Sequence, residues 1–318
     1  MGKTAFIFPG QGSQYVGMGK DAAEQYKLSA DIFEAADEAL GFSLSGLVFE
    51  GGEDELKKTE NTQPALLATC MALCAPLTAG GFMPDVAAGL SIGEYAAHVL
   101  SGTLSFKDAV KTVRLRGRFM QEEVPLGVGG MAAVLGLDAV AVAACCAEAP
   151  ACADDTSLVV EPTNYNCPGQ IVIAGHMKAV EAACALCKGR GAKRALPLAV
   201  SAPFHSSLLR GAGEKLAAVL AGIELGAMRI PVVSNVTAEC VTDPQEAIQL
   251  LIRQVASPVK WEQCVRAMIA CGVTRFVEIG PGKTLAGFLK KIDAGAEVIN
   301  ISDAASIDSA LSLLAAVL

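Results

Sequence analysis

The chain has 318 residues, of which 52% are hydrophobic and 18% are charged, and its formal net charge is −8. This length predicts one large domain or two unequal domains. The apolar content excludes an intrinsically disordered chain. The acidic balance argues against a dedicated nucleic-acid-binding protein, which needs a basic surface to displace counterions.

Before residue 125, the spacing of apolar residues predicts alternating strands and helices. The expected elements are strands at 3–8 and 86–90 and helices within 21–40, at 92–100 and at 105–123. Ser105, followed three residues later by Asp108, resembles a capping box that opens the last of these helices.

Residues 61–84 carry no charge and are the best candidate for a membrane span. Prolines and glycines interrupt the stretch, and its uninterrupted part, 65–77, is well short of the ~20 apolar residues that a span needs. We therefore expect a buried helix and no membrane association. The first residues lack a long apolar segment, so no signal peptide is expected.

The chain contains eleven cysteines, an odd number without a repeated spacing. A disulfide framework is not expected in a chain of this length. Cys184 and Cys187 form a C-x-x-C sequence, but there is no second pair and no nearby histidine. We expect buried reduced thiols rather than metal or redox chemistry, and a cytoplasmic protein.

Residues 126–198 are predicted to form a small inserted subdomain. The expected elements are strands at 131–135, 157–161, 170–174 and 194–200, with helices at 139–147 and 178–188. This β-α-β-β-α-β order is the ferredoxin-like pattern. The flanking segments, 1–125 and 199–318, are expected to form a larger α/β subdomain around a mostly parallel sheet.

Residues 89–93 form a G-x-S-x-G sequence between an expected strand and an expected helix. A sharp strand-to-helix turn strains the serine backbone, and the flanking glycines let the turn close. The hydroxyl of Ser91 is then presented at a helix N-terminus, where backbone N–H groups stabilise developing negative charge. We favour a nucleophile over an ordinary glycine-bounded turn.

A serine nucleophile needs a base, and the candidates are His98, His176 and His205. His98 lies on the same helix as Ser91 but ~10 Å along its axis, too far for a hydrogen bond. His176 lies within the insert, and a plain solvated histidine is the favoured interpretation there. His205 follows the strand that leaves the insert, which favours it over His176 without excluding His176.

The glycine-rich loop at 10–14 follows the first strand. It does not match the dinucleotide pattern G-x-G-x-x-G, because Tyr15 occupies the last glycine position. The Gly-Lys-Thr sequence at 282–284 does not match a P-loop, because Val277 occupies the first glycine position. The remaining interpretation of the first loop is a set of backbone N–H donors for an anionic centre.

Arg116 lies on the apolar side of the helix expected at 105–123, opposite a stripe of basic residues. A buried guanidinium must be paired, because burying it alone is very costly. Two interpretations remain open. Arg116 forms an internal ion pair with a carboxylate, or its planar fork binds the carboxylate of a substrate.

Together these motifs resemble the malonyl-CoA:acyl-carrier-protein transacylase family over essentially the whole chain. The resemblance rests on ordered matches at 8–14, 62–66, 89–94, 116–121, 164–170, 203–205 and 278–282. One residue departs from the family pattern. Many members have His before the serine, whereas this chain has Leu90, which predicts drier surroundings for the nucleophile.

The resemblance implies transfer of a malonyl group from malonyl-CoA to the phosphopantetheine thiol of acyl carrier protein, supplying fatty acid or polyketide synthesis. Ser91 would be the acylated nucleophile and His205 its base, oriented by the main-chain carbonyl of Gln254. The implied fold is an α/β-hydrolase-like large subdomain with a ferredoxin-like insert. No metal or other cofactor is implied, and nothing in the sequence demands more than a monomer.

The resemblance also assigns the substrate contacts. Arg116 would bind the malonyl carboxylate, and the backbone N–H groups of Gln11 and Ile92 would form the oxyanion hole. Phe204, beside the base, is expected to narrow the pocket near the malonyl α-carbon. The alternatives are a serine esterase or thioesterase with the same elbow, and a catalytically inactive module that binds a nucleotide or a carrier.

Overall fold

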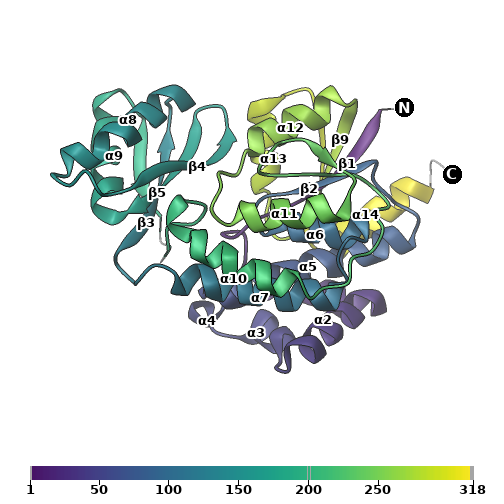
Figure 1. Ribbon diagram of the computed structural model, residues 1–318. Helices are drawn as coiled ribbons and strands as arrows, with labels where there is room; N and C mark the ends of the chain where they lie inside the picture. The colour runs from purple at the N-terminus through teal and green to yellow at the C-terminus, as the bar shows by residue number, and fades with distance from the viewer. Residues whose placement is uncertain (1, 199, 201, 316–318) are drawn as a thin grey trace.

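The computed structural model describes residues 2–198, 200 and 202–315. These residues form two β-sheets, a six-stranded sheet and a four-stranded sheet, each with its own covering helices (Figure 1). Residues of both sheets and of the loops that follow their strands line one cavity, which is described below.

The six-stranded sheet is the centre of the larger part of the protein. In spatial order its strands are β10 (Glu297–Ile301), β9 (Val273–Ile279), β1 (Lys3–Phe8), β2 (Val86–Gly89), β7 (Val232–Val233) and β8 (Cys240–Val241). All neighbouring strands are parallel except β7 and β8. The mostly parallel sheet expected from the sequence is therefore present.

Helices cover both faces of this sheet. They are α1 (Lys20–Gln25), α2 (Lys27–Leu40), α3 (Leu44–Glu50), α4 (Glu53–Lys57), α5 (Thr59–Ala79), α6 (Gly93–Ser101), α7 (Phe106–Glu122), the short η1 (Ser207–Leu209), α10 (Arg210–Leu220), α11 (Pro244–Gln254), α12 (Trp261–Ala270), α13 (Thr284–Ile292) and α14 (Ala304–Ala315). In β1, Phe6 and Phe8 join one core and Ala5 and Ile7 the other. This double burial explains why the last four residues of β1 are all apolar.

The four-stranded sheet is antiparallel, with the order β4 (Val160–Cys167), β5 (Gln170–His176), β3 (Gly129–Leu135) and β6 (Arg194–Pro197). Two helices, α8 (Ala139–Cys152) and α9 (Met177–Gly189), cover one of its faces. The β-α-β-β-α-β order expected in this region is observed.

The second strand of this sheet was predicted in the wrong place. The expected span was 157–161, whereas β4 runs from Val160 to Cys167. Ser157 instead belongs to a turn, in which its N–H and hydroxyl both donate to Asp155 Oδ1. The true strand was hidden because its polar sequence and two register shifts against β5 break the usual alternation. The expected strand at 194–200 ends at Pro197, and residue 199 lies outside the described residues.

The helices before residue 80 also differ from expectation. The helix expected within 21–40 is divided at Tyr26, whose extended backbone separates α1 from α2. The helix expected at 65–77 is longer, because α5 continues through Pro64 and Pro76. Tertiary packing stabilises it, since nearly all of its residues are buried.

Among the described residues, α5 is the one helix long and apolar enough to cross a membrane. However, 83% of its most apolar window is buried inside the protein. Length and hydropathy alone do not separate a span from a core helix, and here the burial identifies a core helix. Its neighbour across the core is α7, which carries Arg116.

Gly117 determines how closely α7 approaches α5, because a Cβ built there would lie 2.6 Å from the Thr59 carbonyl oxygen. We expect Gly117→Ala to lower the free energy of unfolding by about 1–3 kcal/mol through overpacking. The matched control is Gly287→Ala in α13, where a Cβ meets nothing within 4 Å. That substitution is expected to stabilise the protein by up to about 1 kcal/mol. Urea unfolding measures both, and equal effects would contradict the packing argument.

Candidate active site

The strand–turn–helix predicted around Ser91 is present. β2 ends at Gly89, α6 begins at Gly93, and Ser91 between them has a left-handed φ of 54°. A Cβ on Gly89 would lie 1.9 Å from the Gly93 carbonyl carbon, and one on Gly93 would lie 2.2 Å from the Phe8 carbonyl oxygen. Both glycines are therefore required for the sharp turn that presents the Ser91 hydroxyl.

Asn235 holds this turn in its strained conformation. Its Oδ1 accepts from the Ser91 N–H at 2.7 Å, and its Nδ2 donates to the Gly89 carbonyl oxygen at 2.8 Å. The backbone N–H of Asn235 donates to Glu94 Oε2 at 3.1 Å. Asn235 could not be predicted from the sequence, because it lies in the turn after the two-residue strand β7 and belongs to no motif.

The structure brings Ser91 and His205 together. Ser91 Oγ and His205 Nε2 are 2.7 Å apart, and His205 Nδ1 lies 2.8 Å from the main-chain oxygen of Gln254. A carbonyl oxygen only accepts, so Nδ1 carries the proton and Nε2 is free to accept the proton of the serine hydroxyl. The acceptor that orients the imidazole is thus a main-chain carbonyl.

The other two histidines lie elsewhere. His98 is buried and its Nδ1 lies 3.2 Å from Thr103 Oγ1, so it is part of the packed interior. His176 precedes α9, and its Nδ1 accepts a hydrogen bond from the Val159 N–H at 2.9 Å. The prediction of a plain solvated histidine is therefore wrong for His176, because its ring ties β5 to the segment before β4.

Burial keeps the His205 imidazole neutral. It lowers the pKa of His205 to about 3, and the nearby positive charge of Arg116 acts in the same direction. At neutral pH the imidazole is therefore unprotonated and able to accept a proton. Its backbone has a left-handed φ of 64°, so both members of the pair occupy strained conformations that the surrounding structure maintains.

Arg116 is 1% exposed and its guanidinium is bound by neutral groups. Nη1 donates to Gln63 Oε1 at 2.7 Å, while Nη2 donates to Gln254 Oε1 at 2.9 Å and to Ser91 Oγ at 3.1 Å. Among the described residues no carboxylate forms an ion pair with it. The internal ion pair considered in the sequence analysis is therefore not what the structure shows.

The side chain of Gln254 links Arg116 to Glu94, because its Oε1 accepts from Arg116 Nη2 and its Nε2 donates to Glu94 Oε2 at 2.5 Å. Burial raises the pKa of Glu94 to about 7, against the lowering effect of hydrogen bonds from Asn235 and Gln254. Glu94 Oε1 also lies 4.0 Å from His98 Nε2, but burial lowers the pKa of His98 to about 3, so the two do not form an ion pair.

The residues predicted to supply oxyanion donors lie in the same cavity as Ser91. Gln11 and Ile92 both line the same cavity as Ser91. The two backbone N–H groups donate to no protein acceptor in the described part of the chain. Gly10 packs closely on the elbow, since a Cβ there would lie 2.8 Å from the Leu90 carbonyl oxygen.

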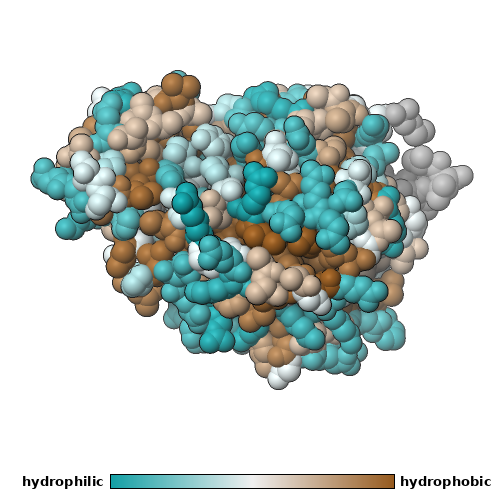
Figure 2. Space-filling view, in the orientation of Figure 1, coloured by the Kyte–Doolittle hydropathy of each residue, from teal (hydrophilic) through white to brown (hydrophobic). Residues whose placement is uncertain are grey.

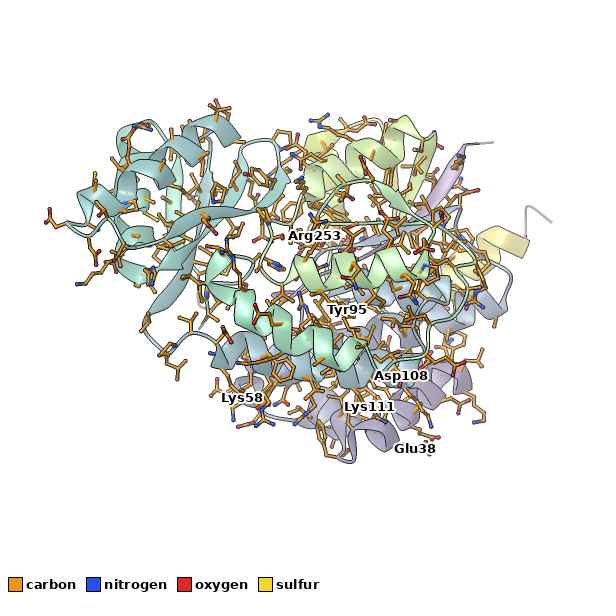
Figure 3. All side chains as sticks on the ribbon, viewed as in Figure 1. Glu38, Lys58, Tyr95, Asp108, Lys111 and Arg253 are labelled. Carbon is orange, nitrogen blue, oxygen red and sulfur yellow. The ribbon has the colours of Figure 1, made fainter. Side chains whose placement is uncertain are left out.

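The cavity has a volume of about 340 Å³ and lies between the loops after β1 and β2 and one face of the four-stranded sheet. Phe204, 8% exposed, and Leu90 contribute apolar walls. Two neighbours of the site are labelled in Figure 3: Arg253, which precedes Gln254 at the end of α11, and Tyr95 of α6. The Tyr95 ring centroid lies 5.5 Å from the guanidinium carbon of Arg116.

A second hollow, of about 460 Å³, lies between α10 and α11. An apolar strip is visible there in Figure 2, and the lining is mainly leucine and isoleucine. No titratable or nucleophilic side chain lines it. Of these two cavities, only the first combines a nucleophile, a base and a cation.

Two motifs from the sequence have structural roles. In the segment 278–282, the Glu278 carboxylate accepts from the backbone N–H groups of Leu285 and Ala286 at 3.0 and 2.8 Å and so caps α13. Cys184 and Cys187 are buried free thiols, as expected. Within the described residues no group of three or more His, Cys, Asp or Glu side chains is arranged to hold a metal.

Comparison with known proteins agrees with this geometry. A family model described as an acyl transferase domain matches residues 5–309. The malonyl CoA-acyl carrier protein transacylase of Bacillus subtilis is 48% identical over 99% of this chain and 98% of its own length. The protein of the same name from Escherichia coli K12 is 46% identical over 98% of this chain and 100% of its own.

Solved structures give the same result. An acyl carrier protein S-malonyltransferase from Vibrio cholerae superposes with a TM-score of 0.93 at 47% identity, covering 96% of this chain and 99% of its own. A malonyl-transacylase in complex with a type II polyketide synthase acyl-carrier protein superposes with a TM-score of 0.94 at 43% identity, covering 98% and 99%.

The low pKa of His205 predicts how the stability of the fold depends on pH. Between its ordinary value of 6.5 and about 3, the unfolded chain binds a proton that the folded protein does not. This residue therefore destabilises the fold progressively as pH falls through that window. Urea unfolding gives the free energy of unfolding at a pH above this window and at a pH within it. We expect this free energy to fall less between the two pH values for His205→Gln than for the wild type. Glu94 has the opposite slope because its pKa is raised, but it is present in both proteins. An equal fall in the free energy of unfolding for the variant and the wild type would contradict the prediction.

Proposed function

Because this chain belongs to the malonyl CoA-acyl carrier protein transacylase family and is an acyltransferase, we propose that it transfers a malonyl group from malonyl-CoA to the phosphopantetheine thiol of an acyl carrier protein. The group is carried as an ester of Ser91. The observation that supports this most strongly is the 2.7 Å contact between Ser91 Oγ and His205 Nε2, with Arg116 Nη2 only 3.1 Å from the same oxygen.

In the first half-reaction, Ser91 Oγ attacks the thioester carbonyl of malonyl-CoA while its proton passes to His205 Nε2. The negative oxygen of the tetrahedral intermediate accepts from the N–H groups of Gln11 and Ile92. Loss of one such donor typically costs about 2.7–4 kcal/mol of transition-state stabilisation. The carbon–sulfur bond then breaks, and the coenzyme A sulfur takes the proton from His205.

In the second half-reaction, the phosphopantetheine thiol gives its proton to His205 and attacks the malonyl ester. The ester bond breaks, and Ser91 recovers the proton from the imidazole. One thioester is exchanged for another, so the reaction is nearly isoenergetic and reversible, with ping-pong kinetics. Neither half-reaction changes an oxidation state, so no redox cofactor is needed.

Arg116 is the group that selects a malonyl donor. Its partners inside the protein are neutral amide and hydroxyl oxygens, so its positive charge is available to a substrate carboxylate. Burial also lowers its pKa, although a guanidinium remains charged at neutral pH. Phe204 limits the space near the malonyl α-carbon.

We also propose a division into two subdomains. Residues 1–125 and 199–318 form an α/β-hydrolase-like part, and residues 126–198 a ferredoxin-like part; the strand order β4-β5-β3-β6 supports the latter. The protein works as a cytoplasmic monomer without nucleic acid or membrane, supplying malonyl groups for fatty acid or polyketide synthesis.

The covalent intermediate is the direct test of this function. Incubation with malonyl-CoA is expected to release one equivalent of thiol, stall without an acceptor, and add one malonyl group to Ser91 in the mass spectrum. Ser91→Ala should form no adduct. Steady thiol release without an acceptor would instead identify a thioesterase, and the absence of any adduct on the wild type would contradict catalysis through Ser91.

The role of Arg116 predicts a change in substrate preference. Arg116→Ala is expected to lower kcat/KM for malonyl-CoA by about 100-fold or more, because a buried charge partner is lost. Acetyl transfer should rise relative to malonyl transfer, since acetyl has no carboxylate. Arg118→Ala, on the exposed side of the same helix, is the control and should change neither. An equal loss with both donors would contradict the carboxylate contact.

A further inference from the structure

Glu94 is a buried carboxylate that none of the proposed chemical steps uses. It is the second residue of α6, three residues after Ser91, and its side chain is fully buried. A buried carboxylate is costly unless hydrogen bonds and an opposite charge compensate for the loss of water. The partners of Glu94 therefore show what its charge does in the site.

Glu94 Oε2 connects two parts of the site. It accepts from the Asn235 N–H at 3.1 Å and from Gln254 Nε2 at 2.5 Å. Asn235 holds the turn that carries Ser91, and Gln254 Oε1 accepts from Arg116 Nη2. One carboxylate oxygen thus supports the turn through one neighbour and the guanidinium through the other.

The two ends of the Gln254 amide face groups of opposite kind. Nε2 faces two acceptors, Glu94 Oε2 and the Ser91 main-chain oxygen at 3.1 Å, whereas Oε1 faces a donor, Arg116 Nη2, at 2.9 Å. A rotated amide would place its NH₂ group against the guanidinium and its oxygen against the carboxylate. The bond to Glu94 is the shorter of the two and the charge-assisted one, so it contributes most to the observed orientation.

The groups around Glu94 leave Arg116 as its counterion. His98 Nε2 lies 4.0 Å from Glu94 Oε1, but burial lowers the pKa of His98 to about 3, so this ring is neutral. Burial raises the pKa of Glu94, and the positive charge of Arg116 counteracts part of that rise. The other groups that face the carboxylate are uncharged at neutral pH; they are Tyr95, Ser234, Asn235, Gln254 and Cys264.

We propose that Glu94 is a positioning residue for Arg116: its ionised carboxylate fixes the Gln254 amide, which holds the guanidinium where it binds the carboxylate of the acyl donor. The proposal rests on the function proposed above, in which Arg116 selects malonyl over acetyl. Glu94 is not among the described residues that line the cavity, so it acts on the donor through Gln254 and Arg116.

The ionisation of Glu94 makes this support depend on pH. Burial raises its pKa to about 7, so the group is mostly neutral below that pH and mostly charged above it. Oε1 has no hydrogen-bond partner among the described residues, and it can take up the proton while Oε2 keeps both of its bonds. A hydrogen bond to a neutral acceptor is about half as strong as one to a carboxylate. Protonation therefore weakens the hold on Gln254 without abolishing it.

The test is the ratio of kcat/KM for malonyl-CoA to kcat/KM for acetyl-CoA, because damage to Ser91 or His205 lowers both values alike. At about pH 8 we expect Glu94→Gln, which keeps a neutral acceptor, to lower this ratio about 5-fold. Glu94→Ala, which removes the acceptor, should lower it about 10-fold or more. Since Glu94→Gln has nearly the native shape, the test does not depend on whether Glu94→Ala folds.

The pH profile of the same ratio separates the charge of Glu94 from its shape. The wild-type ratio should fall about 5-fold between about pH 8 and about pH 6, whereas the ratio for Glu94→Gln should stay constant. His98 and His205 do not titrate in this range, because burial lowers both pKa values to about 3. In a ping-pong reaction kcat/KM for the donor reports only the first half-reaction, so the thiol of the acceptor does not contribute.

Glu278→Gln is the matched control, because it removes the charge of a second buried carboxylate, whose hydrogen bonds go to α13 and Asn300. It should leave the ratio and its pH profile as in the wild type. An unchanged or raised ratio in Glu94→Gln would overturn the proposal, as would a wild-type ratio that does not change with pH. If the wild type formed no malonyl adduct, the proposed function would fail. A normal adduct with an unaffected ratio in Glu94→Gln would contradict the role of Glu94 alone.

Discussion

A positive charge buried beside the Ser91 hydroxyl is the constraint on which the rest of this site depends. Arg116, cut off from water, must find hydrogen-bond acceptors inside the protein. It finds them on Gln63 of α5 and on Gln254 at the end of α11, in segments far apart in the sequence. The same charge helps to keep His205 neutral. The substrate selection proposed for Arg116 and the neutral state of His205 therefore have a common electrostatic origin.

The parts of the structure that depend on near neighbours could be predicted from the sequence. The apolar run of β1 has the predicted bounds, Lys3 to Phe8. Ser105 caps α7, its Oγ accepting from the Asp108 N–H at 3.1 Å. The elbow around Ser91 was predicted for the same reason, since the glycines that permit it flank the serine directly.

Features that depend on distant segments could not be predicted in this way. Ser91 and His205 are 114 residues apart, so local pattern favoured His205 over His176 only weakly, and the family resemblance made the choice. Asn235 reaches the elbow because β7 pairs with β2, and β7 is only two residues long and gives no periodic signal. Glu94 stands in the recognised motif, but its contact with Gln254 exists only after the chain has folded.

Gln254 combines two tasks in two chemically different parts of one residue. Its main-chain oxygen orients the imidazole of His205, while its side-chain oxygen holds Arg116. Every type of residue has a main-chain oxygen, whereas few have a side-chain oxygen that can hold Arg116. A different side chain at position 254 would therefore keep the acceptor for His205 but remove the contact with Arg116. It would also remove the bond from Nε2 to the Ser91 main-chain oxygen at 3.1 Å, so the turn that carries Ser91 is tied to the same side chain.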